Sequence, residues 1–436
     1  NRILFTLAIF LIFRIGSALT VPGVEISKDA FDTNNVFGML NLMGGGALQS
    51  FSLFALGVSP YITAQIIVQL LQMDVLPVLT ELGKEGESGR KKIDMATRYL
   101  TLLLGAVQAY GVTVTMMNSD YITLTDTTIL GYLKIIVYLV AGSMLLMWLG
   151  DQITTKGIGN GISMIIFAGI VSALPNQIYG AFANYLSQNL LTGNPSLILE
   201  GVIKLLLYLL SFFLIVVFVT YTEKSVRKLP VSHSATGQSG NENAQSSFLP
   251  IKINSSGVIP VIFASSIMMA PQVIVSFIDG ADTSAEWLNV FSSSKMTTMP
   301  WFGGKTWQMP WGLIIYVVLI IAFTFFYSSL QINPEQMAEN FQKNGSYIPG
   351  IKPGNETERY VKKVLNRVTF IGAFALAFIA ALPVVLVLVG LLPQSLALGG
   401  TGLIIVVGVA LEVSAQIDGL VAGKSFEEVQ NRAGRE

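Results

Sequence analysis

Long apolar segments recur along the whole chain, and they constrain its fold more than any other feature. Of its 436 residues, 52% are hydrophobic and only 12% are charged, and the mean hydropathy is +0.63. A water-soluble chain of this length could not bury so much apolar side chain, whereas an apolar stretch of about 20 residues matches the thickness of a bilayer. The sequence therefore predicts an all-α integral membrane protein.

About ten segments have spanning length. We place them near residues 3–19, 53–73, 96–117, 129–149, 161–179, 197–219, 255–277, 311–330, 368–389 and 398–417. The first is too long, and too interrupted by arginine, to be the apolar core of a signal peptide, so we interpret it as a spanning helix. Because the chain begins inside this run without an initiator Met, we expect further residues upstream of Asn1.

Basic residues gather in alternate connections between these segments. The basic connections hold Lys84, Arg90, Lys91, Lys92 and Arg98, then Lys224, Arg227 and Lys228, and then Lys343, Lys352, Arg359, Lys362, Lys363 and Arg367. The intervening loops hold little beyond Lys28, Lys295 and Lys305. Since cytoplasmic loops carry the excess of Lys and Arg, this alternation predicts that both termini are cytoplasmic.

One short phrase occurs in each half of the chain. Residues 57–62 read GVSPYI and residues 257–262 read GVIPVI, and a weaker echo pairs GNGI at 159–162 with GTGL at 400–403. A proline within a membrane helix removes a backbone hydrogen bond, so the paired prolines predict interrupted helices at equivalent positions. Together the phrases predict two inverted five-helix halves, residues 1–196 and 197–436, with the working site at their interface.

Branched aliphatic side chains occupy the four helices that carry these phrases. They are Val58, Ile62, Ile162, Ile166, Ile262, Ile404 and Ile405, and Val258 stands at the position equivalent to Val58. Each one alone is typical of a lipid-facing or core residue. Together, in segments nearly free of ionisable groups except for Arg14, they predict an apolar constriction, which closes a pore by excluding water.

A glycine-rich stretch precedes the second segment. It reads FGMLNLMGGGALQSFSLFALG, and its Asn41, Gln49 and Ser50 make it too polar to face lipid. Three consecutive glycines allow close backbone packing or movement. We interpret the stretch as a short helix folded back into a cavity, and an ordinary re-entrant loop fits the composition equally well.

Several long motifs together resemble the SecY family, the channel subunit of the bacterial Sec translocon. They are GGGALQSFSLFALGVSPYITAQIIVQLL, GIGNGISMIIFAGIV, LPIKINSSGVIPVIFASSI, NPEQMAENFQKNGSYIPGIKPG and GGTGLIIVVGVALE, spread over essentially the whole chain. The resemblance implies a passive protein-conducting channel with a central pore between two inverted halves. It implies a pore ring of Val58, Ile62, Ile162, Ile166, Ile262 and Ile405, and a plug helix near residues 40–50 that includes Met43, Gly44, Gly45, Gly46, Ala47 and Leu48. Helices two, three, seven and eight would form a lateral gate, with Gln69, Gln108 and Asn254 as its polar residues.

The resemblance also implies partners and a location. The partners are SecE- and SecG-type small membrane subunits, the SecA motor ATPase, a translating ribosome, signal peptides with their secretory precursors, and the lipids of a bacterial plasma membrane. The cytoplasmic loops at 220–253 and 331–367 would dock the motor or the ribosome through Arg227, Lys228, Lys343, Lys352 and Arg359.

Two departures from the family pattern concern these loops. Residues 229–251 contain no Lys or Arg and are interpreted as a flexible linker, which makes docking of a ribosome through this loop less certain. Lys352 stands in GIKPG where the family more often has Arg, and Lys lacks the bidentate fork of a guanidinium.

The sequence predicts neither a catalytic site nor a bound cofactor. The chain has no Cys and one His, His233, so neither a thiol nucleophile nor a thiolate metal site is available. Two other classes remain open at this point. A small-solute secondary transporter would share the inverted repeats, and an intramembrane enzyme would need a catalytic group that the predicted spans lack.

Overall fold

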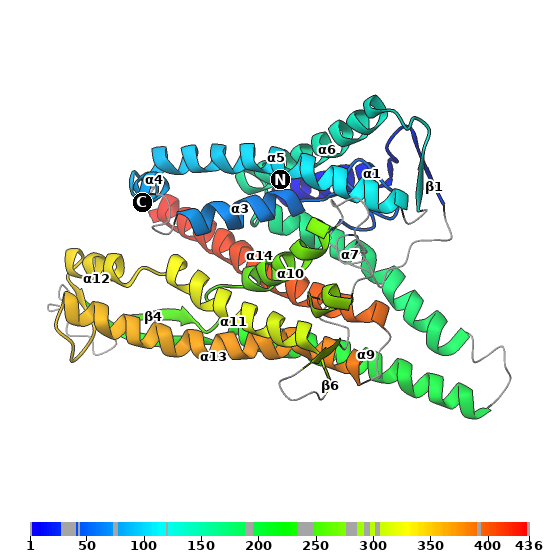
Figure 1. Ribbon diagram of the computed structural model, residues 1–436. Coiled ribbons are helices and arrows are strands. Elements are labelled where there is room, and N and C mark those ends of the chain that lie inside the picture. Colours follow the sequence, from blue (N-terminus) through cyan, green and yellow to red (C-terminus); the bar gives the residue numbers. More distant parts are fainter. Residues whose placement is uncertain are drawn as a thin grey trace.

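The computed structural model describes residues 2–27, 41, 44–72, 77–118, 121–187, 195–233, 247–275, 286–291, 297–300, 306–389 and 394–433. Helices dominate these residues (Figure 1). The helices of the first half are α1 (Arg2–Ala18), α3 (Ser59–Leu71), α4 (Pro77–Lys84), α5 (Glu87–Asn118), α6 (Ile129–Lys156), α7 (Gly161–Phe182) and the π-helical turn η1 (Ala183–Ser187). Those of the second half are α9 (Pro195–Lys224), α10 (Ile259–Val275), the short η3 (Glu286–Phe291), α11 (Trp311–Gln331), α12 (Pro334–Lys343), α13 (Asn355–Leu388) and α14 (Gln394–Ala433).

Three small antiparallel sheets accompany the described helices. Strands β1 (Val24–Ile26) and β2 (Ile122–Leu124) pair with each other, as do β5 (Thr297–Pro300) and β6 (Thr306–Met309). The third sheet has the order β4-β3-β7 and consists of β3 (Val226–His233), β4 (Ser247–Lys252) and β7 (Ser346–Tyr347). Each sheet links loops rather than forming a layer of the core.

Every predicted span coincides with a helix, but not every helix has spanning length. Among the described residues, seven helical stretches are long and apolar enough to cross a membrane, and they belong to α5, α6, α7, α9, α11 with α12, α13 and α14. The apolar helices α1, α3 and α10 have 17, 13 and 17 residues. The structure is thus that of a multi-pass membrane protein, and the count of ten spans stays a prediction.

The paired prolines do not interrupt helices, so that part of the sequence interpretation is wrong. Pro60 and Pro260 occupy the second position of α3 and α10, where the backbone N–H has no intrahelical acceptor in any case. Gly57 and Gly257, three residues earlier, have φ of +57° and +62°, a backbone conformation that favours glycine. The repeated phrase therefore starts a helix in each half, and the second and seventh segments begin later than predicted.

The weaker echo has no structural counterpart. Gly159 has φ of +81° and precedes Asn160, which caps the start of α7 by accepting hydrogen bonds from the N–H groups of Ile162 and Ser163. Residues 400–402 lie instead within α14. The two halves resemble each other at α3 and α10, but not at α7 and α14.

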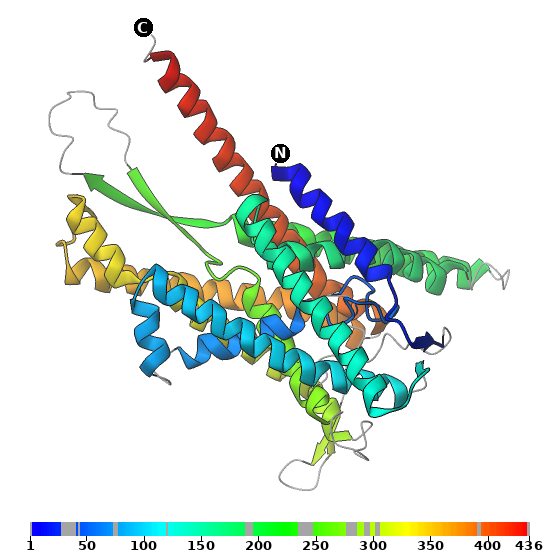
Figure 2. The ribbon, with the colours of Figure 1, turned by 90° about the horizontal axis from the view of Figure 1, so that it is seen from above.

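Two groups of helices meet along α10 and α14. Figure 1 shows α1 and α3–α7 on one side, α9 and α11–α13 on the other, and α10 and α14 between them, and Figure 2 shows α14 crossing the molecule. Helix α14 contacts α7 in the first group and α9 and α13 in the second, while α10 contacts α3, α5 and α11. The largest buried apolar cluster lies where these helices meet.

Part of the predicted flexible linker at 229–251 is a β-hairpin. Strands β3 and β4 pair in antiparallel register from Val226 opposite Lys252 to Val231 opposite Ser247. Buried Leu229 and Ile251 pack with Leu365 of α13, so apolar burial holds the strands in place. The linker interpretation is wrong for these strands, and residues 234–246 lie outside the described part of the chain.

Close packing of α6 on α7 depends on a glycine pair. A Cβ added at Gly161 would collide with the carbonyl oxygen of Gly150, whereas one added at Gly180, in the same helix, would meet nothing within 4 Å. We expect Gly161→Ala to reduce the free energy of unfolding by about 1–3 kcal/mol, because the backbone must shift. Gly180→Ala should leave it unchanged or slightly higher. Thermal unfolding of both purified variants in detergent tests this, and equal midpoints would contradict it.

Candidate functional site

The predicted ring residues gather in the central buried cluster. The exposed fraction is 3% for Val58, 3% for Ile62, 1% for Ile166, 5% for Ile262 and 3% for Ile405. The sixth residue, Ile162, is half-buried and packs against the same cluster. These side chains of α3, α7, α10 and α14 therefore lie in one buried apolar cluster, here called the aliphatic cluster, which also contains aromatic rings. No charged side chain enters it among the described residues.

Two residues outside the predicted ring also belong to this cluster. Val258 is 7% exposed and Ile404 is fully buried. A Cβ at Gly408 of α14 would collide with the Val258 side chain, so the glycine allows the turn before α10 to approach α14. The repeated phrase already paired Val258 with Val58 but assigned Val258 no role.

The glycine-rich segment forms turns rather than the expected helix. Residues 44–58 run as successive turns, and Gly45 and Gly46 have φ of +68° and +85°, values that a regular helix excludes. The backbone N–H of Gly46 donates to the carbonyl oxygen of Asn41 at 2.8 Å. The expectation of a plug helix is therefore wrong for these residues. Met43 lies outside the described residues.

This segment nevertheless folds inward, as predicted. Ala47 and Leu48 are 0% and 1% exposed. The Ser50 hydroxyl donates to the carbonyl oxygen of Ser17 in α1 at 2.9 Å, and the ring of Phe54 stacks on that of Phe13 with centroids 6.0 Å apart. Its position against α1 thus depends on both polar and apolar contacts.

A seam separates α3 and α5 from α10 and α11. On the α3 side, the Gln69 amide lies near the Tyr327 hydroxyl of α11. Its Oε1 has no hydrogen-bond partner among the described residues. On the other side, the Phe263 ring of α10 packs edge-on against Phe323 and Tyr327 of α11, with centroids 5.8 Å apart in each pair. In the part of the chain that the structure describes, aromatic rings thus line the seam, and Gln69 and Tyr327 face each other across it.

Asn254 does not make that cross-seam contact. Its Nδ2 donates to Glu223 Oε1 of α9 at 2.6 Å and to the carbonyl oxygen of Gly257 at 3.0 Å. These bonds tie the start of α10 to its own half of the molecule. The third predicted gate residue, Gln108, is half-buried on α5.

Sequence reasoning missed several polar residues near the seam. Besides Glu223 and Tyr327, a chain of hydroxyl groups runs from Ser255 to Ser328 at 3.0 Å and from Ser328 to Thr369 at 2.7 Å. It connects the segment before α10 with α11 and α13. A carboxylate at the end of the apolar α9 could have drawn attention to Glu223, but single hydroxyl groups in apolar helices carry no comparable signal.

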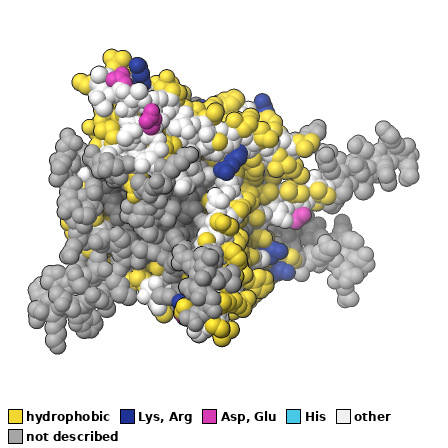
Figure 3. Space-filling view, turned by 90° about the vertical axis from the view of Figure 1, so that its right-hand side faces the viewer, with side chains coloured by type: hydrophobic (Ala, Val, Ile, Leu, Met, Phe, Trp, Pro, Cys, Tyr) yellow, Lys and Arg dark blue, Asp and Glu magenta, His cyan; other side chains and the backbone are white. Residues whose placement is uncertain are grey.

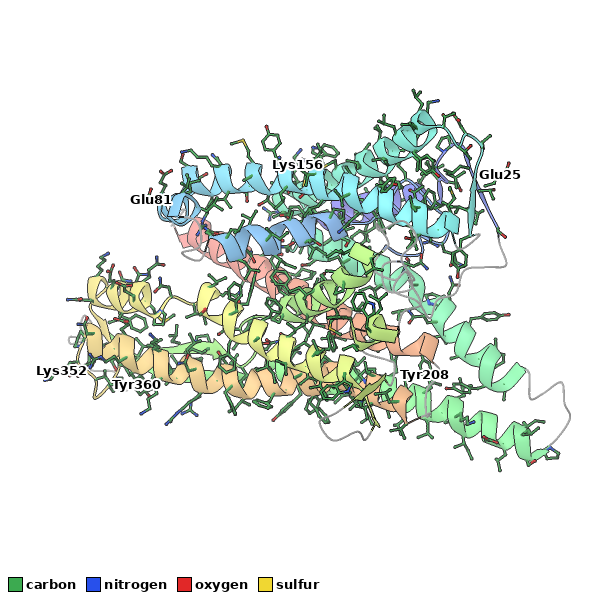
Figure 4. All side chains as sticks on the ribbon, in the orientation of Figure 1. Glu25, Glu81, Lys156, Tyr208, Lys352 and Tyr360 are labelled. Carbon is green, nitrogen blue, oxygen red and sulfur yellow. The ribbon has the colours of Figure 1, made fainter. Side chains whose placement is uncertain are left out.

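The basic segments share one end of the molecule. The starts of α5 and α13, together with α12 and the β3–β4 hairpin, lie at the left in Figure 1, and Figure 4 shows Lys352 there. Arg227, Lys228, Lys343, Lys352 and Arg359 are all exposed. Lys343 pairs with Glu339 at 3.3 Å, and the Lys228 ammonium lies 4.6 Å from the Phe248 ring centre. On the opposite end the described Lys and Arg side chains are scattered among apolar ones (Figure 3).

Comparisons with known proteins agree with this architecture. A family model described as SecY matches residues 52–414. The protein translocase subunit SecY of Halalkalibacterium halodurans is 42% identical over 430 residues, which cover 98% of this chain and 96% of the relative. That of Bacillus subtilis is 42% identical over 430 residues, with 98% and 95% covered.

Solved structures share the fold at lower identity. One of a protein-conducting channel has a TM-score of 0.62 at 19% identity and covers 95% of this chain and 91% of its own. Sec61 from a canine ribosome–channel complex has a TM-score of 0.59, with 19% identity and the same coverage. The full-length match to the curated relatives favours a channel over the transporter and enzyme hypotheses. The chain therefore belongs to the SecY family of protein-conducting channels.

Proposed function

We propose that this chain moves signal-bearing, unfolded polypeptides across a bacterial plasma membrane and releases hydrophobic segments sideways into the bilayer. The observation that carries the proposal is the buried aliphatic cluster to which α3, α7, α10 and α14 all contribute. Aliphatic side chains offer a passing chain no fixed hydrogen-bonding partner, and in a narrow pore they exclude water. Such a constriction suits a conduit for many different sequences.

In this proposal the central cluster is the seal of the resting pore. Its ring consists of Val58, Ile62, Ile162, Ile166, Ile262 and Ile405, and Val258 lies beside them. The segment at residues 44–48 is the plug that covers the ring. A plug domain stabilises the closed state and maintains the membrane seal in a SecY protein whose structure has a TM-score of 0.65 to this one.

The seam between α3 with α5 and α10 with α11 is the proposed lateral gate. An apolar signal helix that enters the seam buries its side chains against Phe263 and Phe323, which favours the separated arrangement. Gln69 is the polar contact that the signal helix must displace, and Gln108 lines the same side. Asn254 acts differently, because its bond to Glu223 keeps the start of α10 attached to α9 while the gate opens.

Residues 1–196 and 197–436 are the two halves that separate in this opening. The excess of Lys and Arg at one end of the molecule supports a cytoplasmic position for that end and for both termini. Hinge-like separation of two packed halves is a common route by which a small contact change opens a site.

The basic end is the proposed docking surface for a SecA-type motor or a ribosome. The canine Sec61 structure comes from a ribosome–channel complex, and the yeast Ssh1 complex was solved on an 80S ribosome. Arg227 and Lys228 of β3, Lys343 of α12, and Lys352 and Arg359 near the start of α13 are the candidate contacts. SecE- and SecG-type subunits complete the channel, and the ATP chemistry belongs to the motor.

Reconstitution tests the proposal directly. The chain is placed in liposomes with its SecE-type partner, and SecA, ATP and a signal-bearing precursor are added. We expect part of the precursor to become resistant to external protease, and to lose that resistance when detergent opens the liposomes. A precursor that stays fully digestible while a labelled small solute enters would support a solute transporter instead.

A further inference from the structure

Arg14 is a charged side chain within the apolar helix α1, and its partner is a backbone carbonyl. Arg14 Nη1 donates a hydrogen bond to the carbonyl oxygen of Gly45 at 3.0 Å. No ion pair joins Arg14 to a carboxylate within the part of the chain that the structure describes. Arg14 is itself exposed, as are its neighbours Leu11 and Ile15 at 60% and 54%, so the charge lies on an otherwise apolar face of α1. An ionisable residue in such a setting is costly and calls for a functional explanation.

The turn at Gly45 lies directly against α7. With φ of +68°, a Cβ at Gly45 would be 2.9 Å from the Cα of Gly169. The Ser172 hydroxyl also approaches the Gly45 carbonyl, at 3.5 Å, but it lies 2.8 Å from the carbonyl oxygen of Gly169 in its own helix. The shorter contact takes the single hydroxyl proton, so Arg14 is the principal donor to Gly45.

Apolar contacts also hold the other flank of the segment. Leu48 belongs to a buried cluster with Met116 of α5 and Ile122 of β2, beside a pocket of about 410 Å³. These apolar contacts have no fixed direction, whereas the Arg14 bond fixes the Gly45 carbonyl oxygen relative to α1.

We propose that Arg14 is the positioning residue that holds the Gly45 turn in the closed arrangement, so that loss of this hydrogen bond favours the open channel. The inference rests on the proposed function, since the turn is a plug only if the protein is a channel. Hydrogen bonds from charged donors are about twice as strong as neutral ones, and an unpaired guanidinium is left behind when the turn moves away. Removing the bond should raise the open fraction about tenfold, because the closed and open states of such proteins differ by little free energy.

The test compares four variants of the reconstituted full chain with its SecE-type partner. Arg14→Leu removes the donor, and Arg14→Lys keeps the charge but replaces the planar fork. Ser17→Ala is the matched control in α1, because the Ser17 hydroxyl donates to the carbonyl oxygen of Arg14 in its own helix and, among the described residues, to no group of the plug. Ser172→Ala removes the weaker contact. Resting ion conductance is measured, together with export of a precursor whose signal sequence is defective.

We expect Arg14→Leu to raise the resting conductance about tenfold and to export the defective precursor, with a smaller rise for Arg14→Lys. Both serine variants should resemble the unsubstituted chain. A general folding defect would lower export of every precursor, so a gain of export identifies a positioning role. The proposal would be overturned if Arg14→Leu had the same resting conductance as the unsubstituted chain and likewise failed to export the defective precursor.

A second measurement covers the case in which Arg14→Leu does not assemble. Leu48→Cys introduces the single thiol of a chain without cysteine, and its labelling by a water-soluble maleimide reports exposure of the plug. Faster labelling in Arg14→Lys than in the parent with arginine supports the positioning role of Arg14, and equal labelling rates overturn that role. If the parent translocates no precursor at all, the proposed function fails, while the labelling rates still decide whether Arg14 positions the turn.

Discussion

Replacing Ile262 with Asn makes the resting channel leak small ions, if the aliphatic cluster is the seal. Ile262 is 5% exposed and lies in the cluster with ring residues of α3, α7 and α14. An amide buried there without a partner draws in water, because burying an unpaired polar group costs about 2–7 kcal/mol. Once water fills the constriction, the barrier to ions falls, and we expect conductance to rise on the order of tenfold or more.

Planar-bilayer recording of the reconstituted channel, without motor or precursor, measures this leak. Ile274→Asn is the matched control, because Ile274 lies in the same helix with 60% of its side chain exposed. Ile162→Asn should have a smaller effect than Ile262→Asn, since Ile162 is only half-buried. Equal conductance in Ile262→Asn and Ile274→Asn would show that the seal lies elsewhere.

Cross-linking the seam should abolish translocation. The chain contains no cysteine, so thiols can be introduced as single pairs. Gln69→Cys on α3 and Tyr327→Cys on α11 replace two residues that face each other across the seam. A short reversible thiol cross-linker between them holds the two sides together. A signal helix could then no longer enter the seam and separate them.

The matched control joins two residues on the same side of the seam. Ser255→Cys and Ser328→Cys replace residues whose hydroxyl groups are 3.0 Å apart, one just before α10 and one in α11. We expect precursor export to fall below about a tenth for the linked Gln69–Tyr327 pair and to recover when the linker is cleaved, because translocation requires the seam to open. Export should persist for the linked Ser255–Ser328 pair. Undiminished export through the linked Gln69–Tyr327 pair would mean that the pore opens along another surface.

The positions of the membrane helices were largely predictable from the sequence. Each predicted span coincides with a helix, because the apolar requirement of a bilayer acts on composition over about 20 residues and needs no tertiary information. The aliphatic cluster was predictable for a related reason. The repeated phrase paired Val58 with Val258 and Ile62 with Ile262, and an apolar side chain at the interface of two halves is buried by either half.

Local backbone geometry was predicted less well. Pro60 is compatible with a kink inside a helix and with the first turn of one, and only the φ of Gly57 decides between them. Likewise, three glycines permit a mobile helix or a set of turns. The choice of turns depends on what lies alongside, here Gly169 of α7 and the side chain of Arg14.

Hydrogen-bond partners were the least predictable. Asn254 was expected at the gate, but it bonds to Glu223, a residue 31 positions earlier. Several polar groups could accept a hydrogen bond from an amide in an apolar setting. Which of them becomes the partner depends on distances of a few tenths of an ångström.

The sequence by itself determined that this protein crosses a membrane many times, which of its ends is basic, and that it belongs to a family of channels. These properties depend on composition, on charge along the chain and on long motifs, none of which requires knowledge of which helices touch. Only the tertiary structure decided that Arg14 holds Gly45, that Gln69 meets Tyr327 across the seam, and that Asn254 stays with α9. These contacts join residues far apart in the chain, and their geometry exists only after the helices have packed.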